Sequence, residues 1–230
     1  MIQTAINLIQ SYAGTHPYHV GFSGGKDSVV VLDLVQRAGV PFEAVYNVTT
    51  FDPPELVRFI KETYPEVRFW LPAERFEDFA QKQGIMPTRF RRYCCRVLKE
   101  RHVSGRTTIT GIRAEESPRR KNNHKEYEAR HGTKMQMMLH PILQWASDEI
   151  WEYIRVRNLP TCSLYREGMH RLGCVGCPIT TPRQRIAGFC KWPHIEARWK
   201  RISKTVWQKR VSAGKTQETE EHFWQWWITN

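Results

Sequence analysis

Short apolar runs alternate with stretches of helical periodicity over the first 160 residues of the chain. The apolar runs predict strands at residues 18–22, 42–48, 67–71 and 107–111. The segments between them, where apolar residues recur at helical spacing, predict helices at residues 2–13, 29–35, 55–63 and 76–83. Strands that alternate with helices of this length indicate an α/β fold with a parallel twisted sheet and helices on both faces.

The second part of the chain has a different pattern. Residues 118–134 are polar and charged, which predicts an exposed, mobile loop. A further helix is predicted at residues 148–157, and the Cys-, Gly- and Pro-rich residues 161–182 predict irregular structure followed by helix. We therefore predict a core domain at residues 1–160. We predict that residues 161–230 form a cysteine-containing loop and a mainly helical C-terminal extension.

Charge is concentrated in two basic blocks. The chain of 230 residues has 35 Lys and Arg against 23 Asp and Glu, a net charge of +12. Residues 89–134 hold 14 basic and 5 acidic side chains, and residues 183–215 hold 10 and 1. Such blocks indicate a polyanion partner, and nucleic acid is the natural one because phosphate contacts supply most of the affinity for it. The alternative is a solvated face with surplus lysine.

Composition restricts the class of protein. Hydrophobic residues make up 40% of the chain and aromatic residues 12%, which excludes a disordered protein. No stretch approaches the roughly 18 apolar residues of a membrane span, and residues 1–4 contain no basic segment of a secretory signal. We expect a cytoplasmic protein with no membrane partner. Its six cysteines are then thiols, metal ligands or catalytic groups rather than disulfides.

A glycine-rich turn follows the first predicted strand and reads Ser23-Gly24-Gly25-Lys26-Asp27-Ser28. Glycines let the backbone approach a ligand closely, and successive N–H groups at a helix N-terminus form an anion pocket. Lys26 adds a point charge, and two serines add hydroxyl donors. The turn therefore predicts a phosphate site, although the usual P-loop spacing is absent. The alternative is an ordinary glycine turn that caps the helix.

Four cysteines form two pairs with the spacing of metal ligands. Cys94 and Cys95 are adjacent, and Cys174 and Cys177 form a C-x-x-C pair. Four thiolates suit a [4Fe–4S] cluster or a structural zinc ion, and the spacing alone leaves both open beside a site without metal. The spare cysteines, at positions 162 and 190, are predicted to be small buried hydrophobes, with residue 162 as the better candidate for a sulfur carrier.

These motifs together resemble a known family. The S-G-G-K-D-S string resembles the PP-loop of the ATP pyrophosphatase superfamily, the adenine nucleotide α-hydrolases. Residues 110–119, TGIRAEESPR, resemble the GIR-x-EES-x-R segment of its phosphoadenylylsulfate (PAPS) reductase branch, and the C-C…C-x-x-C pattern resembles the cluster-binding cysteines of that branch. The resemblance covers roughly residues 16–200.

The resemblance implies a set of functional residues. The catalytic residues would be Lys26, Ser28 and Arg113. The nucleotide would contact Ser23, Gly24, Gly25, Lys26, Asp27, Ser28, Thr49, Gly111, Arg113 and Arg119. A [4Fe–4S] cluster, with zinc as the alternative, would be held by Cys94, Cys95, Cys174 and Cys177. ATP would bind with Mg²⁺, to which Asp27 and Asp52 could contribute oxygen ligands.

The chain departs from the reductases of this family in one respect. Those enzymes carry a catalytic cysteine near the C-terminus, and this chain has none after Cys190. Residues 47–55, NVTTFDPPE, instead resemble the DNA phosphorothioation relatives. That resemblance implies an ATP pyrophosphatase that activates an acceptor by adenylation for sulfur transfer.

The implied acceptor is nucleic acid, DNA rather than tRNA, and the implied sulfur donor is a separate protein such as a cysteine desulfurase. Two alternatives stay open. One is a PAPS or adenylylsulfate reductase that produces sulfite. The other is a nucleic-acid-binding module with a vestigial nucleotide site.

Overall fold

The computed structural model describes residues 1–99, 106–130 and 136–229, which form two compact units interleaved along the chain. The sheet unit comprises Met1–Asn47, Pro54–Trp70 and His102–Leu172, and the helical unit comprises Val48–Pro53, Leu71–Arg101 and Gly173–Asn230. The predicted boundary after residue 160 divides the chain differently and stays a prediction.

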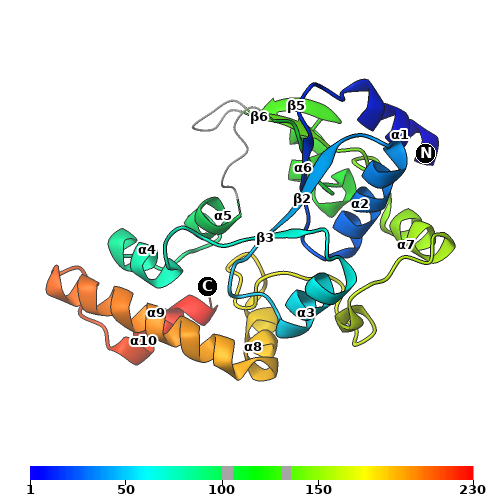
Figure 1. The fold of residues 1–230 in the computed structure, drawn as a ribbon. Coiled ribbons are helices and arrows are strands. Elements are labelled where there is room, and N and C mark those ends of the chain that lie inside the picture. Colours follow the sequence, from blue (N-terminus) through cyan, green and yellow to red (C-terminus); the bar gives the residue numbers. More distant parts are fainter. Residues whose placement is uncertain (100–105, 131–135, 230) are drawn as a thin grey trace. The chain divides into compact units, whose positions relative to one another are not determined.

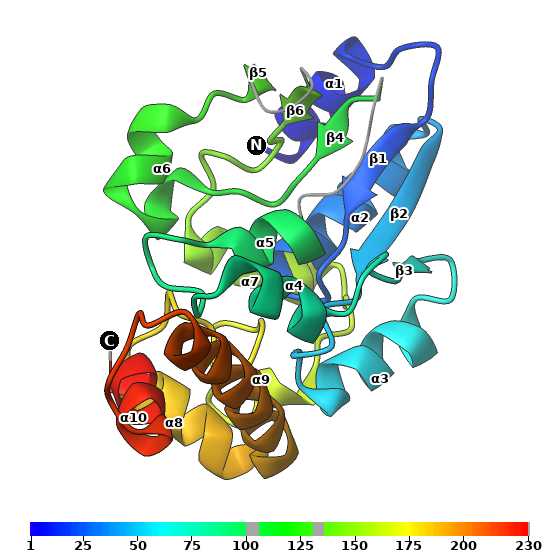
Figure 2. The ribbon, with the colours of Figure 1, turned by 90° about the vertical axis from the view of Figure 1, so that its left-hand side faces the viewer.

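The sheet unit contains six strands in the order β3-β2-β1-β4-β6-β5 (Figures 1 and 2). The strands are β1 (Tyr18–Gly21), β2 (Phe42–Asn47), β3 (Arg68–Trp70), β4 (Thr108–Ile109), β5 (Tyr127–Arg130) and β6 (Gln136–Leu139). All neighbouring pairs are parallel except β5 and β6. The prediction of a mostly parallel α/β sheet is confirmed, and the antiparallel edge strand β5 is an addition to it.

Helices flank this sheet. They are α1 (Ile2–Ser11), α2 (Lys26–Ala38), α3 (Pro54–Thr63), α6 (Pro118–Asn123) and α7 (Ser147–Val156), with short 3-10 turns η1 (Ala114–Glu116) and η2 (Ser163–Tyr165). In Figure 1, α1, α2 and α7 lie side by side, in agreement with their contacts. The central helix α2 ends at Gly39, whose left-handed backbone (φ 66°) closes the helix.

The prediction of an exposed loop at residues 118–134 is wrong over its first part. Ser117 caps α6 by accepting a hydrogen bond from the amide of Arg120, and β5 then pairs with β6. The polar composition of these residues gives no hydrophobic pattern that could indicate either element. A short helix and an edge strand can each expose most of their side chains. Residues 131–134 lie outside the described residues.

The helical unit contains α4 (Phe76–Gln83), α5 (Tyr93–Leu98), α8 (Pro182–Lys191), α9 (Pro193–Ser212) and α10 (Glu220–Thr229). Its core is aromatic. The ring of Trp199 stacks on Phe51 with centroids 4.3 Å apart and packs against Trp227 at 4.8 Å. Both indole N–H groups donate to backbone carbonyls and both side chains are buried, so these tryptophans are core residues.

Across the described ranges, the helices are too short or too polar for any of them to span a bilayer.

Candidate functional site

The nucleotide turn lies at the point where the strand order of the sheet reverses. From β1 the chain proceeds to β2 and β3 on one side, whereas β4 and β6 lie on the other. Ligands of open α/β sheets bind in the crevice at the carboxyl ends of the strands at such a point. Two loops leave these carboxyl ends, one from β1 and one from β4. The first leads through residues 23–25 into the start of α2 at Lys26, and the second contains Gly111 and Arg113.

Hydrogen bonds between the two serines hold the turn in shape. The Ser23 hydroxyl donates to Ser28 Oγ (3.1 Å), which also accepts from the Ser23 amide (3.2 Å). Ser28 Oγ in turn donates to the carbonyl of Gly25 (2.8 Å). Ser28 is 4% exposed, so its hydroxyl supports the turn from inside. The first amides of α2 have no acceptor within the helix, and those other than the Lys26 amide, which donates to the hydroxyl of Tyr165, are available to an anion.

Gly24 is required by its surroundings as well as by its backbone. Its φ is 70°, and a Cβ atom placed there would lie 2.7 Å from Ile60 Cγ1 and 2.8 Å from Leu56 Cδ1. Both neighbours are on α3 and are at most 1% exposed. The turn therefore packs directly on α3, at a distance that only glycine permits.

Three charged side chains converge beside the turn. Lys26 Nζ donates to both carboxylate oxygens of Asp27 (3.0 and 2.9 Å), and Arg113 Nε donates to Asp27 Oδ1 (2.6 Å). Lys26 is 7% exposed and Arg113 is 4% exposed. The Asp27 carboxylate thus joins the β1 loop to the β4 loop, and a buried cation lies on each side of it.

Gly111 lets these two loops approach each other. A Cβ atom at this position would lie 3.0 Å from the carbonyl carbon and from Cβ of Asp27. Arg113 also donates to Glu115 Oε2 (2.5 Å) and to the carbonyl of Trp145 (3.2 Å), so its guanidinium is held in place by three acceptors. Arg119, at the start of α6, is exposed.

Tyr165, whose place in the site the sequence did not reveal, contacts the turn. Its hydroxyl accepts a hydrogen bond from the amide of Lys26 (2.8 Å), and burial raises the pKa of the phenol to about 12. The two partners are 139 positions apart in the sequence, which explains why no local sequence signal indicates the contact. One of the amides predicted to bind an anion therefore already donates to the phenol oxygen.

The four cysteines of the predicted metal site all belong to the helical unit. The pKa of Cys94 is raised, first by a hydrogen bond with Cys95, then by burial and by the nearby sulfurs of Cys95, Cys177 and Cys174. Burial raises the pKa of Cys174 to about 12. The structure therefore brings the four thiols into one neighbourhood, although 78 residues separate the two pairs in the sequence.

Positive charge lies beside these thiols. Attraction to Cys174 raises the pKa of Lys99. Arg185 is 1% exposed, and its guanidinium donates to backbone carbonyls. Burial lowers the pKa of Arg185, whereas the negative charge of Cys177 acts to raise it. Among the described residues, Arg185 Nε is a buried donor without a hydrogen-bond partner. A buried guanidinium beside thiols fits a site that carries negative charge.

Thr49, predicted to contact nucleotide, belongs to this helical unit. It is fully buried, donates to Asp52 Oδ2 (2.7 Å) and hydrogen-bonds with Cys174. Thr49 and Asp52 therefore lie beside the cysteine site. The roles predicted for them in binding nucleotide and Mg²⁺ stay predictions.

A comparison with known protein families decides the family. The model of the phosphoadenosine phosphosulfate reductase domain matches residues 17–180, which include the turn, the β4 loop and all four cysteines. The chain belongs to the phosphoadenosine phosphosulfate reductase family.

Curated relatives of this family member are distant. Two uncharacterized proteins of Methanocaldococcus jannaschii are each 27% identical to it; the matches cover 84% and 90% of this chain but only 42% and 51% of those proteins. The chain thus spans about half of their length. Adenosine 5'-phosphosulfate reductase 2 of Bacillus subtilis is 28% identical over 74% of this chain and 76% of its own.

A solved structure shares the fold. The PAPS reductase of Candida auris, crystallised with phosphate, superposes with a TM-score of 0.57 and 17% identity over 74% of this chain and 88% of its own. The likeness confirms the fold that the pattern of strands and helices predicts.

The two spare cysteines differ in exposure. Cys162 is fully buried, and burial raises the pKa of its thiol. Cys190 is exposed on α8, so the prediction of a buried residue is wrong for Cys190. A buried position agrees with Cys162 as a small hydrophobic residue and leaves it out of reach of a partner in this conformation.

Proposed function

We propose that this PAPS reductase family member binds ATP with Mg²⁺ at residues 23–28, cleaves it between the α- and β-phosphates, and adenylates an oxygen of an acceptor that sulfur then replaces. The observation that supports this most is the Lys26–Asp27–Arg113 arrangement at the switch point of the sheet. It combines helix amides, a buried ammonium and a carboxylate at the position where such folds bind nucleotides.

Each group has a role in the proposed reaction. The amides of the turn and Lys26 would stabilise the charge that develops on the departing pyrophosphate. Asp27, freed from Lys26 by the incoming phosphates, would supply an oxygen ligand to Mg²⁺. Ser28 would keep the turn in its binding conformation, and Arg113 would hold Asp27 in position. The contacts of Arg113 and Arg119 with phosphate stay predictions.

The cysteine site suits a [4Fe–4S] cluster, with a zinc ion as the alternative. The sulfurs of Cys95, Cys174 and Cys177 all raise the pKa of Cys94, so the four thiols lie close enough to act on one another. Four cysteine thiolates are the ligand set of such a cluster. Cys94, Cys95, Cys174 and Cys177 would hold it. The cluster would contribute a compact anionic centre, whose charge Lys99 and Arg185 would offset.

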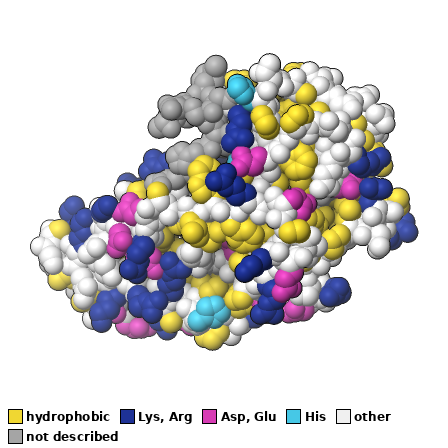
Figure 3. Space-filling model, viewed as in Figure 1, with side chains coloured by type: hydrophobic (Ala, Val, Ile, Leu, Met, Phe, Trp, Pro, Cys, Tyr) yellow, Lys and Arg dark blue, Asp and Glu magenta, His cyan; other side chains and the backbone are white. Residues whose placement is uncertain are grey.

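Nucleic acid is the acceptor that the surface supports. Figure 3 shows Lys and Arg side chains gathered over α9 in the helical unit. In the same unit Phe90 is 94% exposed, and its neighbours along the chain are Arg89, Arg91 and Arg92. An exposed aromatic ring among arginines suits the stacking of an unpaired base beside backbone phosphates. DNA, rather than tRNA, is the acceptor we propose.

The proposed transfer balances without a change in oxidation state. A phosphodiester oxygen of the acceptor attacks the α-phosphorus of ATP, and pyrophosphate leaves. Hydrosulfide then attacks the phosphorus of the acceptor, and AMP leaves with the original oxygen. A separate protein, such as a cysteine desulfurase, would supply the sulfur as a persulfide, and a pair of thiols would reduce it by two electrons to hydrosulfide and become a disulfide.

Anaerobically purified protein can test this proposal with ATP, Mg²⁺, DNA and sulfide. We expect pyrophosphate release that depends on DNA, and phosphorothioate in the recovered DNA. Lys26→Ala should lower the rate at least about 100-fold, the magnitude seen when one preorganised donor to a developing charge is lost. Lys61→Ala, an exposed lysine of α3, is the matched control and should retain the wild-type rate. Pyrophosphate release without phosphorothioate would contradict the proposed acceptor.

The exposed phenylalanine gives an independent test of the acceptor. Phe90→Ala should weaken binding of single-stranded DNA by about 1–3 kcal/mol, the value of one base–aromatic stack. Leu71→Ala removes another exposed apolar side chain (70% exposed) and should leave binding unchanged. Equal affinities of the two variants would argue against stacking on Phe90.

A second candidate function is the reduction of adenylylsulfate to sulfite, which the name of the Bacillus subtilis relative favours. This reaction needs no ATP and consumes two electrons from a thiol. Incubation with adenylylsulfate and dithiothreitol would yield sulfite and AMP if it is correct. The same protein would then release no pyrophosphate from ATP.

A further inference from the structure

Two histidines and a glutamate that the proposed reaction does not use converge in the sheet unit. They are His124, which follows α6, Glu128 on β5, and His140, which follows β6. His124 Nδ1 lies 2.8 Å from Glu128 Oε1, and His140 Nε2 lies 3.4 Å from the same oxygen. In the described part of the chain, this is the one group of three metal-ligating side chains whose ligand atoms all lie within 4.8 Å of one another.

The surrounding hydrogen bonds orient the three groups as a metal site requires. His140 is fully buried, and its Nδ1 is 2.8 Å from the hydroxyl of Thr110, so the second nitrogen faces Glu128. Histidines that ligate metals are oriented in this way by a partner at the other ring nitrogen. Glu128 Oε2 accepts from the amide of Lys125 (3.0 Å), and Oε1 is the atom directed at the two imidazoles.

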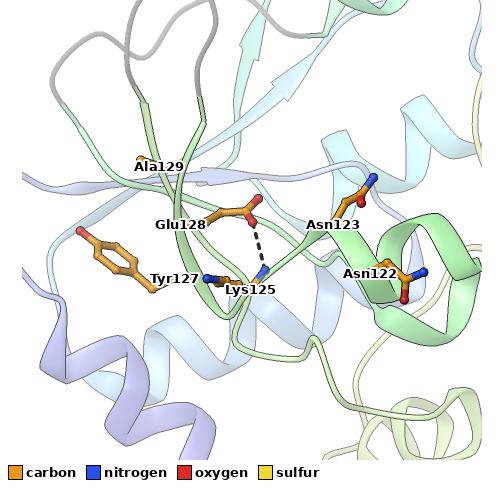
Figure 4. Close-up of a pocket in the computed structure, with 6 residues that line it drawn as sticks. All are labelled: Asn122, Asn123, Lys125, Tyr127, Glu128 and Ala129. Atoms are coloured by element: carbon orange, nitrogen blue, oxygen red, sulfur yellow. Dashed lines mark hydrogen bonds between the residues drawn. The ribbon is translucent and has the colours of Figure 1, made fainter.

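The site is reachable from solvent. The side chains of His124 and Glu128 are 16% and 15% exposed. An open pocket of about 400 Å³ lies beside Glu128 and is lined by Asn122, Asn123, Lys125, Tyr127, Glu128 and Ala129. Figure 4 shows Glu128 extending from β5 toward the end of α6, where the two asparagines lie, while Tyr127 points away from them. An ion held by the triad would therefore have room for water or a small ligand on its open side.

We propose that His124, Glu128 and His140 bind a divalent first-row transition-metal ion, separately from the cysteine site. Two imidazole nitrogens and one carboxylate form the donor set of zinc sites that keep an open position and of non-haem Fe(II) sites. Mg²⁺, which prefers an all-oxygen shell, fits this set poorly. Three protein ligands leave at least one position free, and the pocket beside Glu128 is where it would open.

Zinc binding to the anaerobically purified, iron-loaded protein tests this assignment. We expect one equivalent of Zn²⁺ by elemental analysis after dialysis, with no loss of iron. Calorimetry should give one binding event that excess Mg²⁺ does not suppress. Removing a ligand should cost more than the 10–100-fold that the loss of an outer partner costs, so His124→Ala and Glu128→Gln should weaken binding more than about 100-fold.

A matched control is present in the same chain. His222 and Glu218 form another histidine–carboxylate pair four residues apart, with 3.0 Å between His222 Nδ1 and Glu218 Oε2. His222→Ala should therefore leave zinc affinity unchanged. If wild type, His124→Ala and Glu128→Gln bind zinc equally, or if none of them binds it, the triad is a hydrogen-bonded network and the proposal is wrong.

The outer partner gives a second test that does not depend on removing a ligand. Thr110→Val removes the hydroxyl beside His140 Nδ1 and should weaken zinc binding about 10–100-fold. Thr110→Ser retains the hydroxyl and should restore the affinity. Far-ultraviolet circular dichroism of each variant checks that the fold is retained, and a folded Thr110→Val protein with wild-type zinc affinity would contradict the proposed orientation of His140.

Discussion

Gly24→Ala is the substitution that most sharply tests how the nucleotide turn is built. A left-handed conformation costs an L-residue about 1–2 kcal/mol relative to glycine. Gly24 has φ 70°, and the new methyl group would also lie 2.7–2.8 Å from Ile60 and Leu56. Overpacking a core of this kind costs about 1–3 kcal/mol. The expected loss of stability is therefore about 2–5 kcal/mol.

Gly39→Ala separates the two contributions. Gly39 has nearly the same φ, 66°, but no atom lies within 4 Å of the position of its Cβ. This variant should lose only the conformational cost of about 1–2 kcal/mol. Urea unfolding of both proteins, with linear extrapolation to water, measures the difference.

The expected difference between the two variants is about 1–3 kcal/mol, which is the overpacking cost. Relief of the overlap must move the turn off α3. Gly24→Ala should therefore also weaken ATP binding at least about tenfold, a loss of about 1.4 kcal/mol, while Gly39→Ala should not. Equal losses of stability in the two variants would refute the direct packing of the turn on α3.

Three further predictions concern other parts of the chain. Gly111→Ala places a methyl group 3.0 Å from Asp27 and should abolish ATP binding in a calorimetric titration. Gly14→Ala is the control, because its new methyl group has no atom within 4 Å, and it should bind ATP normally. Burial holds the pKa of His19 at about 4, below its ordinary 6.5, so the fold prefers the neutral ring. Unfolding free energy should fall by up to about 3 kcal/mol as the pH drops from 6.5 to 4, and His19→Asn should remove that dependence in urea unfolding; an unchanged slope would contradict it. Arg185→Met should leave buried carbonyls without their donor and lower the free energy of unfolding by about 1–3 kcal/mol. Because the charge of Arg185 would offset that of a cluster, this variant should also contain less iron than the exposed control Arg183→Met.

The sequence predicts the sheet well because its central strands are short, buried and apolar. The predicted strands at residues 18–22 and 42–48 correspond to β1 and β2, and the glycine turn lies between β1 and α2 as expected. β5 and β6 were missed. β5 reads Tyr-Glu-Ala-Arg, and a polar edge strand carries no hydrophobic alternation that could indicate it.

The candidate site was only partly predictable for a related reason. Motifs indicate residues that are close in sequence, such as the turn and each cysteine pair. Contacts between distant residues, such as that of Arg113 with Asp27, follow only from the fold. The convergence of His124, Glu128 and His140 needed the β5–β6 hairpin, so no spacing in the sequence could indicate it.

The identity of the nucleotide product tests the central claim most directly. Anaerobically purified protein is incubated with ATP labelled at the α-phosphate, Mg²⁺, DNA and sulfide, and the labelled products are separated by chromatography. The account predicts labelled AMP in step with unlabelled pyrophosphate, and neither from Lys26→Ala. Labelled ADP with inorganic phosphate, or complete recovery of intact ATP, would contradict it.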